Sequence, residues 1–326
     1  MGEFELIKRY FARPARQAAL GVGDDCALLQ PAAGMQLAIS SDMLVEGRHF
    51  LSTVDPFKLG HKALAVNLSD LAACGARPLA FTLALALPRA DDAWLAPFAQ
   101  GLFALADAHG CELVGGDTTQ GPLNICITVF GEVPVQNGRS QALLRSGAQA
   151  GDDLYVSGTL GDARLALEVF RGNLSLPAAV FEAARARMEQ PAPRVTLGIA
   201  LRGLATSAVD VSDGLLGDLG HILQQSGVGA TVDADAAAAQ VATRATGACD
   251  AVSIDQWRSW ALAGGDDYEL LFTAPQPKRT QVAHAARAAH TVVTRIGQID
   301  AQRGLRLIDA QGRLLPNNHT SFDHFA

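Results

Sequence analysis

The spacing of apolar residues predicts three helices and four strands in the first half of the chain. Phe4, Ile7 and Phe11 recur at helical spacing and predict a short amphipathic helix. Helices are also expected over 55–75 and 91–110, because each segment opens on an Asp that suits an N-cap and closes on a Gly. Apolar runs predict strands at 37–40, 79–87, 112–114 and 124–133.

A polar, turn-rich stretch at 134–151 separates this half from a second one, so we place a domain boundary between residues 150 and 151. The second half again mixes helices and strands, which indicates an α/β or α+β fold. Residues 234–251 are rich in Ala and carry little pattern. Helices are expected near 161–171, 178–188, 194–204 and 214–225, and strands at 154–156, 208–211, 269–273, 291–299 and 305–308.

Composition narrows the class of protein. The 326 residues are 49% hydrophobic and 18% charged, enough apolar material for a large core, and this length favours two domains. A net charge of -7 without a basic run argues against nucleic acid or an anionic membrane as partner. Five cysteines without a C-x-x-C pair disfavour disulfides and zinc. The longest apolar stretch, 79–87, is less than half a membrane span, so we expect a cytoplasmic protein.

The acidic residues are unevenly divided, with 24 Asp against 9 Glu. Several of these Asp residues sit just past or beside apolar runs, where a loop would expose them at the edge of a sheet, and one lies inside a predicted helix. They are Asp24 and Asp25 in GVGDDCALL, Asp42 in LAISSDML, Asp70 in AVNLSDLAACGA, Asp117 in LVGGDTT, and Asp210 and Asp213 in SAVDVSDGL.

Convergence of these carboxylates would require cations. Two carboxylates at about 4 Å repel by about 4 kcal/mol at an effective dielectric constant near 20. Oxygen ligands select hard cations, and Mg²⁺ shared between carboxylates, hydroxyls and substrate phosphates is the usual case. Taken singly, each Asp is better explained as a turn or cap residue. Taken together, their similar sequence contexts favour a site with several ions.

Two glycine-containing segments suit phosphate groups, because small residues let backbone N–H groups approach an anion. The segment 115–119 places two glycines beside Asp117, whereas 157–161 is better explained as a plain helix start. Neither a Walker A loop nor a complete G-x-G-x-x-G fingerprint is present. Arg145 is a cation in a polar linker, with phosphate binding and a solvated surface role about equally favoured. No nucleophile elbow is found, which disfavours a covalent hydrolase.

Taken jointly, these motifs resemble the thiamine-monophosphate kinase family, within the superfamily that includes aminoimidazole ribonucleotide synthetase. The matching segments run in family order from residue 2 to residue 325. They are GEFELIKRYF, GVGDDCALL, LAISSDMLVEGRHF, KALAVNLSDLAACGARP, LVGGDTT, RSGAQAGD, VDVSDGLLGDLGHI, GGDDYELLF and FDHF.

The resemblance implies a two-domain fold of α/β plus α+β class, like that of aminoimidazole ribonucleotide synthetase. Residues 1–150 would form an α/β domain that binds ATP and Mg²⁺ and builds a barrel across a homodimer, and 151–326 an α+β domain. It also implies direct transfer of the γ-phosphoryl group of ATP to thiamine monophosphate, assisted by several Mg²⁺ ions and without a general base. Thiamine monophosphate, ATP and a second copy would be the partners.

The same resemblance implies individual site residues. The metal ligands would be Asp25, Ser40, Ser41, Asp42, Asp70, Asp117, Asp210 and Asp213. ATP would contact Gly116, Asp117, Arg145 and Ser212. Thiamine monophosphate would contact His49, Asp266 and Phe322. Ser41 keeps a hydroxyl where the family often has Thr, and Asp266 is one methylene shorter than the commoner Glu.

Two alternatives are weighed against this function. One is another ATP-using enzyme of the superfamily, a synthetase or cyclase. Selenophosphate synthetase should carry a reactive Cys near its N-terminus, but the first Cys here, Cys26, follows the Asp pair. The hydrogenase-maturation relative should end in a reactive Cys, whereas this chain ends in Asp-His-Phe-Ala. The other alternative is a non-catalytic nucleotide or magnesium sensor, which retention of the metal-ligand motifs disfavours.

Overall fold

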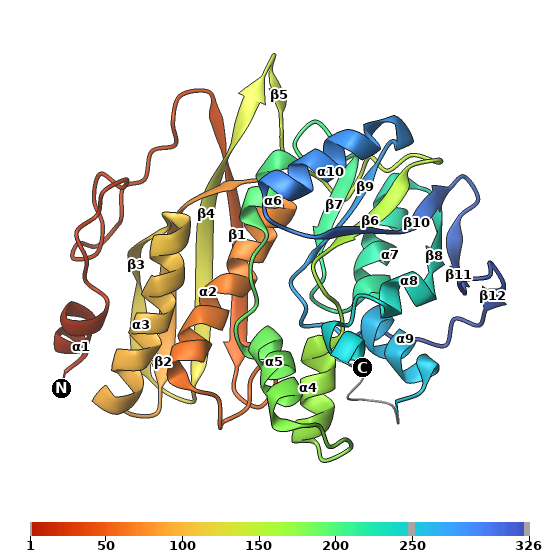
Figure 1. Ribbon diagram of the computed structural model, residues 1–326. Coiled ribbons are helices and arrows are strands. Elements are labelled where there is room, and N and C mark those ends of the chain that lie inside the picture. Colours follow the sequence, from red (N-terminus) through yellow and green to blue (C-terminus); the bar gives the residue numbers. More distant parts are fainter. Residues whose placement is uncertain (1, 247–251, 323–326) are drawn as a thin grey trace. The chain divides into compact units, whose positions relative to one another are not determined.

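The computed structural model describes residues 2–246 and 252–322, with two compact units (Figure 1). Unit 1 comprises 1–71 and 76–141, and unit 2 comprises 72–75 and 142–326. The chain thus passes into unit 2 a few residues before the predicted boundary. Cys249 and residues 323–326, which include the last three residues of the FDHF segment, lie outside the described residues.

Unit 1 is a twisted sheet with helices on one face. Its strands run in the order β1-β4-β2-β3, with the short β5 paired to β4. Only β2 and β3 are parallel neighbours, and the other neighbouring pairs are antiparallel. The elements are α1 (Glu3–Tyr10), β1 (Met35–Val45), α2 (Pro56–Ala73), β2 (Arg77–Leu87), α3 (Asp92–His109), β3 (Glu112–Gln120), β4 (Asn124–Gln136) and β5 (Arg139–Ser140).

The predicted helix starts are confirmed, since Asp side chains cap α2 and α3. Asp55 accepts a hydrogen bond from the Phe57 N–H at 2.8 Å, and Asp91 accepts one from the Ala93 N–H at 3.0 Å. Gly110 ends α3 in the left-handed conformation, as a C-terminal glycine is expected to. These caps set where both helices begin, and so which side chains face the sheet.

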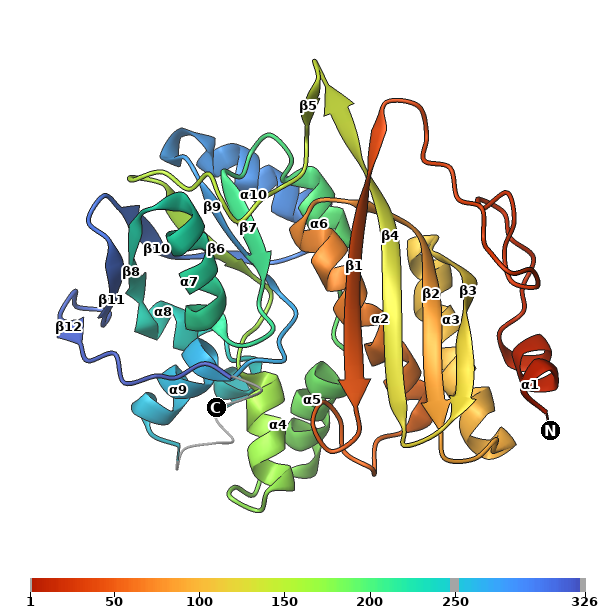
Figure 2. The same ribbon diagram turned by 180° about the vertical axis from the view of Figure 1, so that it is seen from behind.

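Helices α2 and α3 approach each other through glycines. A Cβ on Gly101 of α3 would lie 1.8 Å from the carbonyl oxygen of Phe57, and one on Gly60 of α2 would lie 2.0 Å from that of Phe98. Such contact brings both helices close over a core that includes the fully buried Phe81. The opposite face of β1, β4 and β2 carries no helix among the described parts of unit 1, and Figure 2 shows this face from the front.

Unit 2 is built on a seven-stranded sheet in the order β12-β11-β8-β10-β6-β9-β7. Its neighbours are antiparallel except β8 and β11. The strands are β6 (Asp153–Ser157), β7 (Ser207–Asp210), β8 (Gly229–Asp233), β9 (Leu270–Ala274), β10 (Val293–Asp300), β11 (Gly304–Ile308) and β12 (Leu314–Leu315). The helices are α4 (Asp162–Phe170), α5 (Ala178–Glu189), α6 (Val195–Ala200), α7 (Leu215–Ser226), α8 (Ala234–Ala238), α9 (Ile254–Ala263) and α10 (Arg279–Ala288), with short 3₁₀ turns η1 (Ala242–Thr246) and η2 (Gln276–Lys278).

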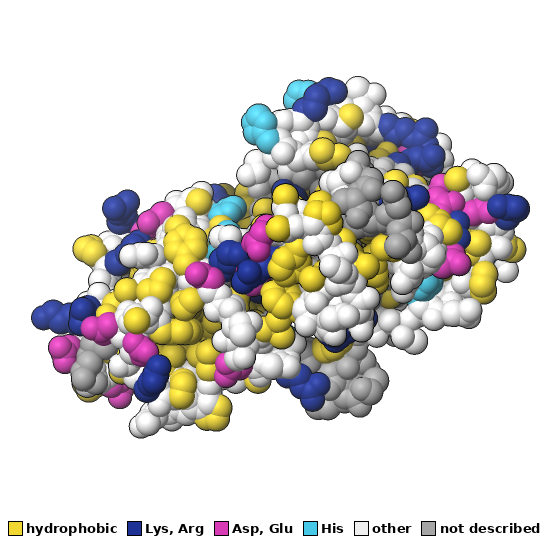
Figure 3. Space-filling model, turned by 60° about the horizontal axis from the view of Figure 1, so that its bottom comes forward, with side chains coloured by type: hydrophobic (Ala, Val, Ile, Leu, Met, Phe, Trp, Pro, Cys, Tyr) yellow, Lys and Arg dark blue, Asp and Glu magenta, His cyan; other side chains and the backbone are white. Residues whose placement is uncertain are grey.

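The sequence pattern predicted most of these elements but missed several in unit 2. Helices α9 and α10 and strand β8 were not expected, and α6 is shorter than predicted. The core of unit 2 is one cluster of buried aliphatic and Trp side chains from its sheet and from α4, α7, α8 and α9. None of the helices in the described residues has the length and apolarity to cross a membrane. On the face drawn in Figure 3, basic and acidic side chains are interspersed.

The close approach of α2 and α3 predicts a large stability difference between two Gly→Ala variants. Gly101→Ala would force a Cβ into the Phe57 carbonyl and should lower the free energy of unfolding by about 1–3 kcal/mol. Gly220→Ala on α7, where a Cβ meets nothing within 4 Å, should stabilise the protein by about 0.5–1 kcal/mol. Thermal unfolding followed by circular dichroism tests both, and equal melting temperatures would contradict the close helix contact.

Candidate active site

The candidate residues Ser40, Ser41 and Asp42 all lie within strand β1, which continues past the predicted strand end at residue 40. Successive side chains of a strand point to opposite faces, so these three cannot share one side of the sheet. Ser40 Oγ donates a 2.5 Å hydrogen bond to Asp70 Oδ2 on α2, beneath the helices. Ser41 Oγ lies 2.9 Å from Thr128 Oγ1 on the open face. The structure therefore brings Ser40 and Asp70 together.

Helix α2 carries Asp70 and is also hydrogen-bonded to β1. Asp70 lies inside the helix, as predicted, and is half-buried. One turn earlier, Asn67 Oδ1 accepts a 3.0 Å hydrogen bond from the Asp42 N–H, while its amide nitrogen donates to the Ala63 carbonyl. The Asn67 side chain is buried and makes both hydrogen bonds at once. These bonds tie the backbone of β1 at Asp42 to helix α2.

The segment containing Gly116 and Asp117 is a strand and not the loop that its glycines predicted. Both residues belong to β3, paired with β2. Gly116 has a φ of 147°, and a Cβ there would lie 1.8 Å from the Leu83 carbonyl oxygen, so close strand packing requires this glycine. Three strand spacings separate β1 from β3, so the strands that carry Asp42 and Asp117 lie roughly 14 Å apart.

Asp25 and His49 lie in irregular segments of unit 1. Asp25 is exposed in a turn whose ends are bridged by Leu20 and Leu28, and its N–H donates to the neighbouring Asp24 carboxylate at 2.9 Å. His49 Nδ1 accepts a 2.9 Å hydrogen bond from the Val45 N–H. A neutral His49 therefore carries its proton on Nε2, which makes that nitrogen a donor.

In unit 2, Asp210 is the last residue of β7 and is buried, and a tight loop of Ser212 and Asp213 follows it. The loop is held by the side chain of Asp218 on α7, a residue that was not among those predicted from the sequence. Asp218 Oδ2 accepts hydrogen bonds from the N–H groups of Ser212 at 3.0 Å and Asp213 at 3.1 Å. Burial, together with the nearby Asp213 carboxylate, raises the pKa of Asp218 to about 7.

Two further candidates join this loop through backbone hydrogen bonds. The Asp266 N–H donates to the Ser212 carbonyl at 2.7 Å, and the Phe322 N–H donates to the Asp213 carbonyl at 3.1 Å. Asp266 has a φ of 62°, a left-handed conformation that is uncommon outside glycine. Unit 2 thus gathers Ser212, Asp213, Asp266 and Phe322 in one place, although they are distant in sequence.

The segment 157–161 leads into α4, as the favoured helix-start interpretation predicted, and its polar groups are turned inward. The Gly161 N–H donates a 2.8 Å hydrogen bond to Asp267, and Ser157 Oγ donates a 2.6 Å hydrogen bond to Glu269. These groups therefore bind carboxylates of the chain itself. Arg145 is exposed, and within the described residues its guanidinium makes no ion pair.

The candidate ligands offer oxygen atoms only, from carboxylates and Ser hydroxyls, which suits a hard cation such as Mg²⁺. Six of them lie in unit 1, and Asp210 and Asp213 lie in unit 2. Within the described ranges, no group of three or more His, Cys, Asp or Glu side chains is placed to hold a metal ion. Among the candidate ligands, Ser40 and Asp70 are joined by a hydrogen bond between their side chains.

Comparison with known proteins agrees with this arrangement of two units. Models of the AIR synthase related protein match the chain twice, the N-terminal domain over residues 23–133 and the C-terminal domain over 149–310. The thiamine-monophosphate kinase of Salmonella typhimurium is 44% identical over 335 residues, covering 100% of this chain and 98% of that protein. The chain belongs to the thiamine-monophosphate kinase family.

Solved structures of this family have the same fold. Thiamine-monophosphate kinase from Stenotrophomonas maltophilia K279a matches with a TM-score of 0.83 and 45% identity, covering 96% of each chain. A second structure, described as AaThiL complexed with AMPPCP and TMP, matches with a TM-score of 0.76 and 27% identity over 91% of this chain and 89% of that one. The mixed α/β, two-domain architecture predicted from the sequence is therefore confirmed.

The buried Asp267 predicts a pH-dependent difference in stability. Burial raises the pKa of Asp267 well above its usual value of 3.8. At pH values between the unfolded and folded pKa, the carboxyl is therefore protonated in the folded state and ionised in the unfolded state. Stability contributed by the neutral carboxyl is therefore lost as the pH rises. Asp267→Asn cannot ionise, and its melting temperature relative to the unsubstituted protein should increase from about pH 5 to about pH 8. A melting-temperature difference between the two proteins that stays constant in calorimetry over this pH range would contradict a raised pKa of Asp267.

Proposed function

We propose that this protein transfers the γ-phosphoryl group of ATP to thiamine monophosphate, giving thiamine diphosphate and ADP. The observation that carries the proposal is the 44% identity to a thiamine-monophosphate kinase over the entire chain. The description of the AaThiL structure names an ATP analogue and TMP bound to that protein. The grouping of Ser212, Asp213, Asp266 and Phe322 in unit 2 supports the proposal, since these residues would form a site for such substrates.

The chemistry requires positioning more than proton transfer. The acceptor is a phosphate monoester with a second pKa of about 6, so its attacking oxygen is already largely anionic near neutral pH. Catalysis then consists of aligning two polyanions and balancing the charge that moves with the phosphoryl group. Gly116, Asp117, Arg145 and Ser212 would contact ATP, and the exposed Arg145 offers a planar donor for its phosphates.

Thiamine monophosphate would contact three residues with different chemistry. His49 would donate a hydrogen bond from Nε2, because its Nδ1 accepts one from the Val45 N–H. The Asp266 carboxylate would attract the cationic thiamine. Phe322, half of whose surface is exposed, would offer an aromatic ring for contact with the substrate rings.

Several Mg²⁺ ions would be held by oxygen donors of the chain. The proposed ligands are Asp25, Ser40, Ser41, Asp42, Asp70, Asp117, Asp210 and Asp213. Bound ions supply positive charge for the ATP phosphates and the transferring group. Residues 1–150 would act as the ATP and Mg²⁺ binding and dimerisation domain, and 151–326 as the second domain. The four described cysteines are free thiols, which supports the cytoplasm as the compartment.

The direct test is incubation of the purified protein with ATP, Mg²⁺ and thiamine monophosphate, with the products identified by mass spectrometry. Thiamine diphosphate and ADP are expected in equal amounts. A folded protein that consumes ATP without forming thiamine diphosphate would be another enzyme of the superfamily. A folded protein that binds ATP without consuming it would be a nucleotide-binding protein, and either outcome would refute the proposal.

Removal of one proposed metal ligand should impair turnover but leave the fold intact. Asp42→Asn should lower kcat by about 100-fold or more, because a lost ligand weakens charge neutralisation at the phosphates. Its melting temperature should stay close to that of the unsubstituted protein, since the substitution keeps the side-chain shape. The matched control is Asp107→Asn, at an exposed carboxylate paired with Arg13 on the same unit, which should keep full turnover. Normal kcat in Asp42→Asn at limiting Mg²⁺ would exclude it as a ligand.

We also propose that two copies associate through the open face of the unit 1 sheet, in a barrel across the dimer. Strand β1 ends the strand order, and three of its apolar side chains are exposed: Leu37 at 37%, Ile39 at 61% and Met43 at 52%. An apolar strand at a sheet edge usually has a partner, because it otherwise promotes aggregation. A second copy would bury these side chains.

The dimer proposal predicts that one substitution changes the oligomeric state in solution. Ile39→Asp should give monomers in analytical ultracentrifugation, because a charge would be buried in the apolar contact. Ile254→Asp, at a 38% exposed Ile that begins α9 in unit 2, serves as the control and should stay dimeric. A dimer of unchanged affinity with Ile39→Asp would place the interface elsewhere.

A further inference from the structure

The sequence GGDDYE has an alternating burial pattern that separates two groups of residues. Asp267 and Glu269 are buried, with exposed fractions of 5% and 0%, whereas Asp266 before them and Tyr268 between them are half-buried. Asp266 has a φ of 62° and Tyr268 a φ of 51°. Residues other than glycine rarely adopt this left-handed backbone conformation, so the surrounding contacts must stabilise it.

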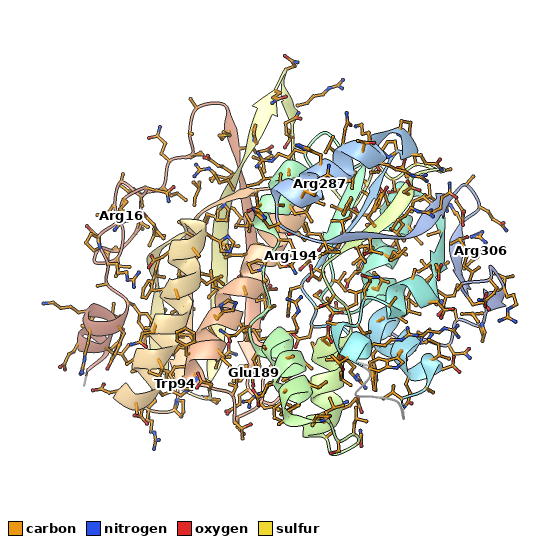
Figure 4. All side chains as sticks on the ribbon, viewed as in Figure 1. Arg16, Trp94, Glu189, Arg194, Arg287 and Arg306 are labelled. Carbon is orange, nitrogen blue, oxygen red and sulfur yellow. The ribbon has the colours of Figure 1, made fainter. Side chains whose placement is uncertain are left out.

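The Glu269 carboxylate is held by three side chains of unit 2. Ser157 Oγ donates to it at 2.6 Å, Arg187 donates at 2.5 Å, and Arg194 donates two hydrogen bonds at 2.6 and 2.5 Å. Arg187 belongs to α5, and Arg194, labelled in Figure 4, directly precedes α6. A buried carboxylate with two guanidinium partners has little freedom to move.

The backbone of the segment 157–161 completes this holding arrangement. Gly158 has a φ of 55°, and a Cβ there would lie 2.0 Å from Glu269 Oε1, so the backbone is in direct contact with the carboxylate. Gly161 donates its N–H to Asp267 Oδ1 at 2.8 Å. Ser157 Oγ also accepts the Leu270 N–H at 2.8 Å, which fixes the start of β9. The loop is thus anchored at every second residue.

The anchored loop meets the candidate substrate residues on its other side. The Asp266 N–H donates to the Ser212 carbonyl, and the Tyr268 N–H donates to the Val211 carbonyl at 2.8 Å. A shift of the buried carboxylates would therefore move Asp266 relative to Ser212. Displacements of about 1 Å at a binding group can change rates by about 100-fold.

We propose that Asp267 and Glu269, held by Gly161, Ser157, Arg187 and Arg194, are positioning residues that set the Asp266 carboxylate for thiamine monophosphate. The proposal rests on the substrate contact of Asp266 proposed above. It assigns to the segment 157–161 a role in substrate selection through the loop that it holds. The expected signature is a defect in binding one substrate, thiamine monophosphate, and not the other, ATP.

The test compares steady-state kinetics of substituted full-length proteins. Asp267→Ala removes the acceptor for the Gly161 N–H and should raise the KM for thiamine monophosphate by about tenfold or more, with the KM for ATP within about twofold. Asp267→Asn keeps an oxygen that can accept this hydrogen bond and should stay within about threefold of the unsubstituted protein. Rescue by Asn separates the role of the hydrogen bond from that of charge.

The matched control is Asp309→Ala. Asp309 is also a buried Asp of unit 2, 4% exposed, whose carboxylate accepts backbone N–H groups, here from Gln311 and Arg313 beside β12. Its loss should lower the melting temperature and leave both KM values unchanged. An equal rise in the KM for thiamine monophosphate in Asp309→Ala and Asp267→Ala would show that general destabilisation causes the defect, and would overturn the proposal.

Asp266→Ala distinguishes failure of this proposal from failure of the substrate contact. A raised KM in Asp266→Ala with an unchanged KM in folded Asp267→Ala overturns the positioning role and leaves the contact standing. An unchanged KM in Asp266→Ala overturns both. If Asp267→Ala does not fold, Ser157→Ala decides, because it removes one donor to Glu269 and keeps both Arg partners. A KM raised about threefold is expected there, and an unchanged KM overturns the proposal.

Discussion

A carboxylate removed from water must be paired, hydrogen-bonded or protonated, and unit 2 depends on how it meets this requirement. Glu269 is paired with two Arg side chains, Asp218 accepts two backbone N–H groups, and Asp267 accepts one and has a raised pKa. Each of these solutions also fixes a loop: Asp218 holds the Ser212 loop, and the other two hold the loop of Asp266. The loops that carry the candidate substrate residues are thus held by buried carboxylates.

In unit 1 the corresponding constraint is the two-residue period of a strand. Because β1 continues through Ser40, Ser41 and Asp42, the hydroxyl of Ser40 reaches Asp70 under α2 while that of Ser41 lies on the open face. On the face covered by the helices, glycines bring α2 and α3 into close contact. The open face instead carries exposed apolar side chains of β1, and the dimer proposal rests on these side chains.

The excess of Asp over Glu has two physical sources. Many of these residues do structural work that needs a short side chain, as when Asp55 and Asp91 cap helices and Asp309 accepts the backbone of a turn. A smaller set has the sequence contexts of the thiamine-monophosphate kinase family and supplies the proposed ligands for Mg²⁺. Asp residues of both sets contribute the same negative charge, so the net charge of the chain does not reveal where the proposed Mg²⁺ site lies.

The sequence by itself determined the family, the mixed α/β class, the helix starts at Asp55 and Asp91, and the residue types suited to Mg²⁺ and phosphate. These properties are local, since a cap or a motif is complete within a few residues. Only the tertiary structure decided that Asp42 and Asp117 lie inside strands, that Asp266 and Phe322 meet the loop after β7, and that Asp218 supports it. These depend on strand pairing and on hydrogen bonds between distant segments. Such contacts leave no periodic signal in the chain.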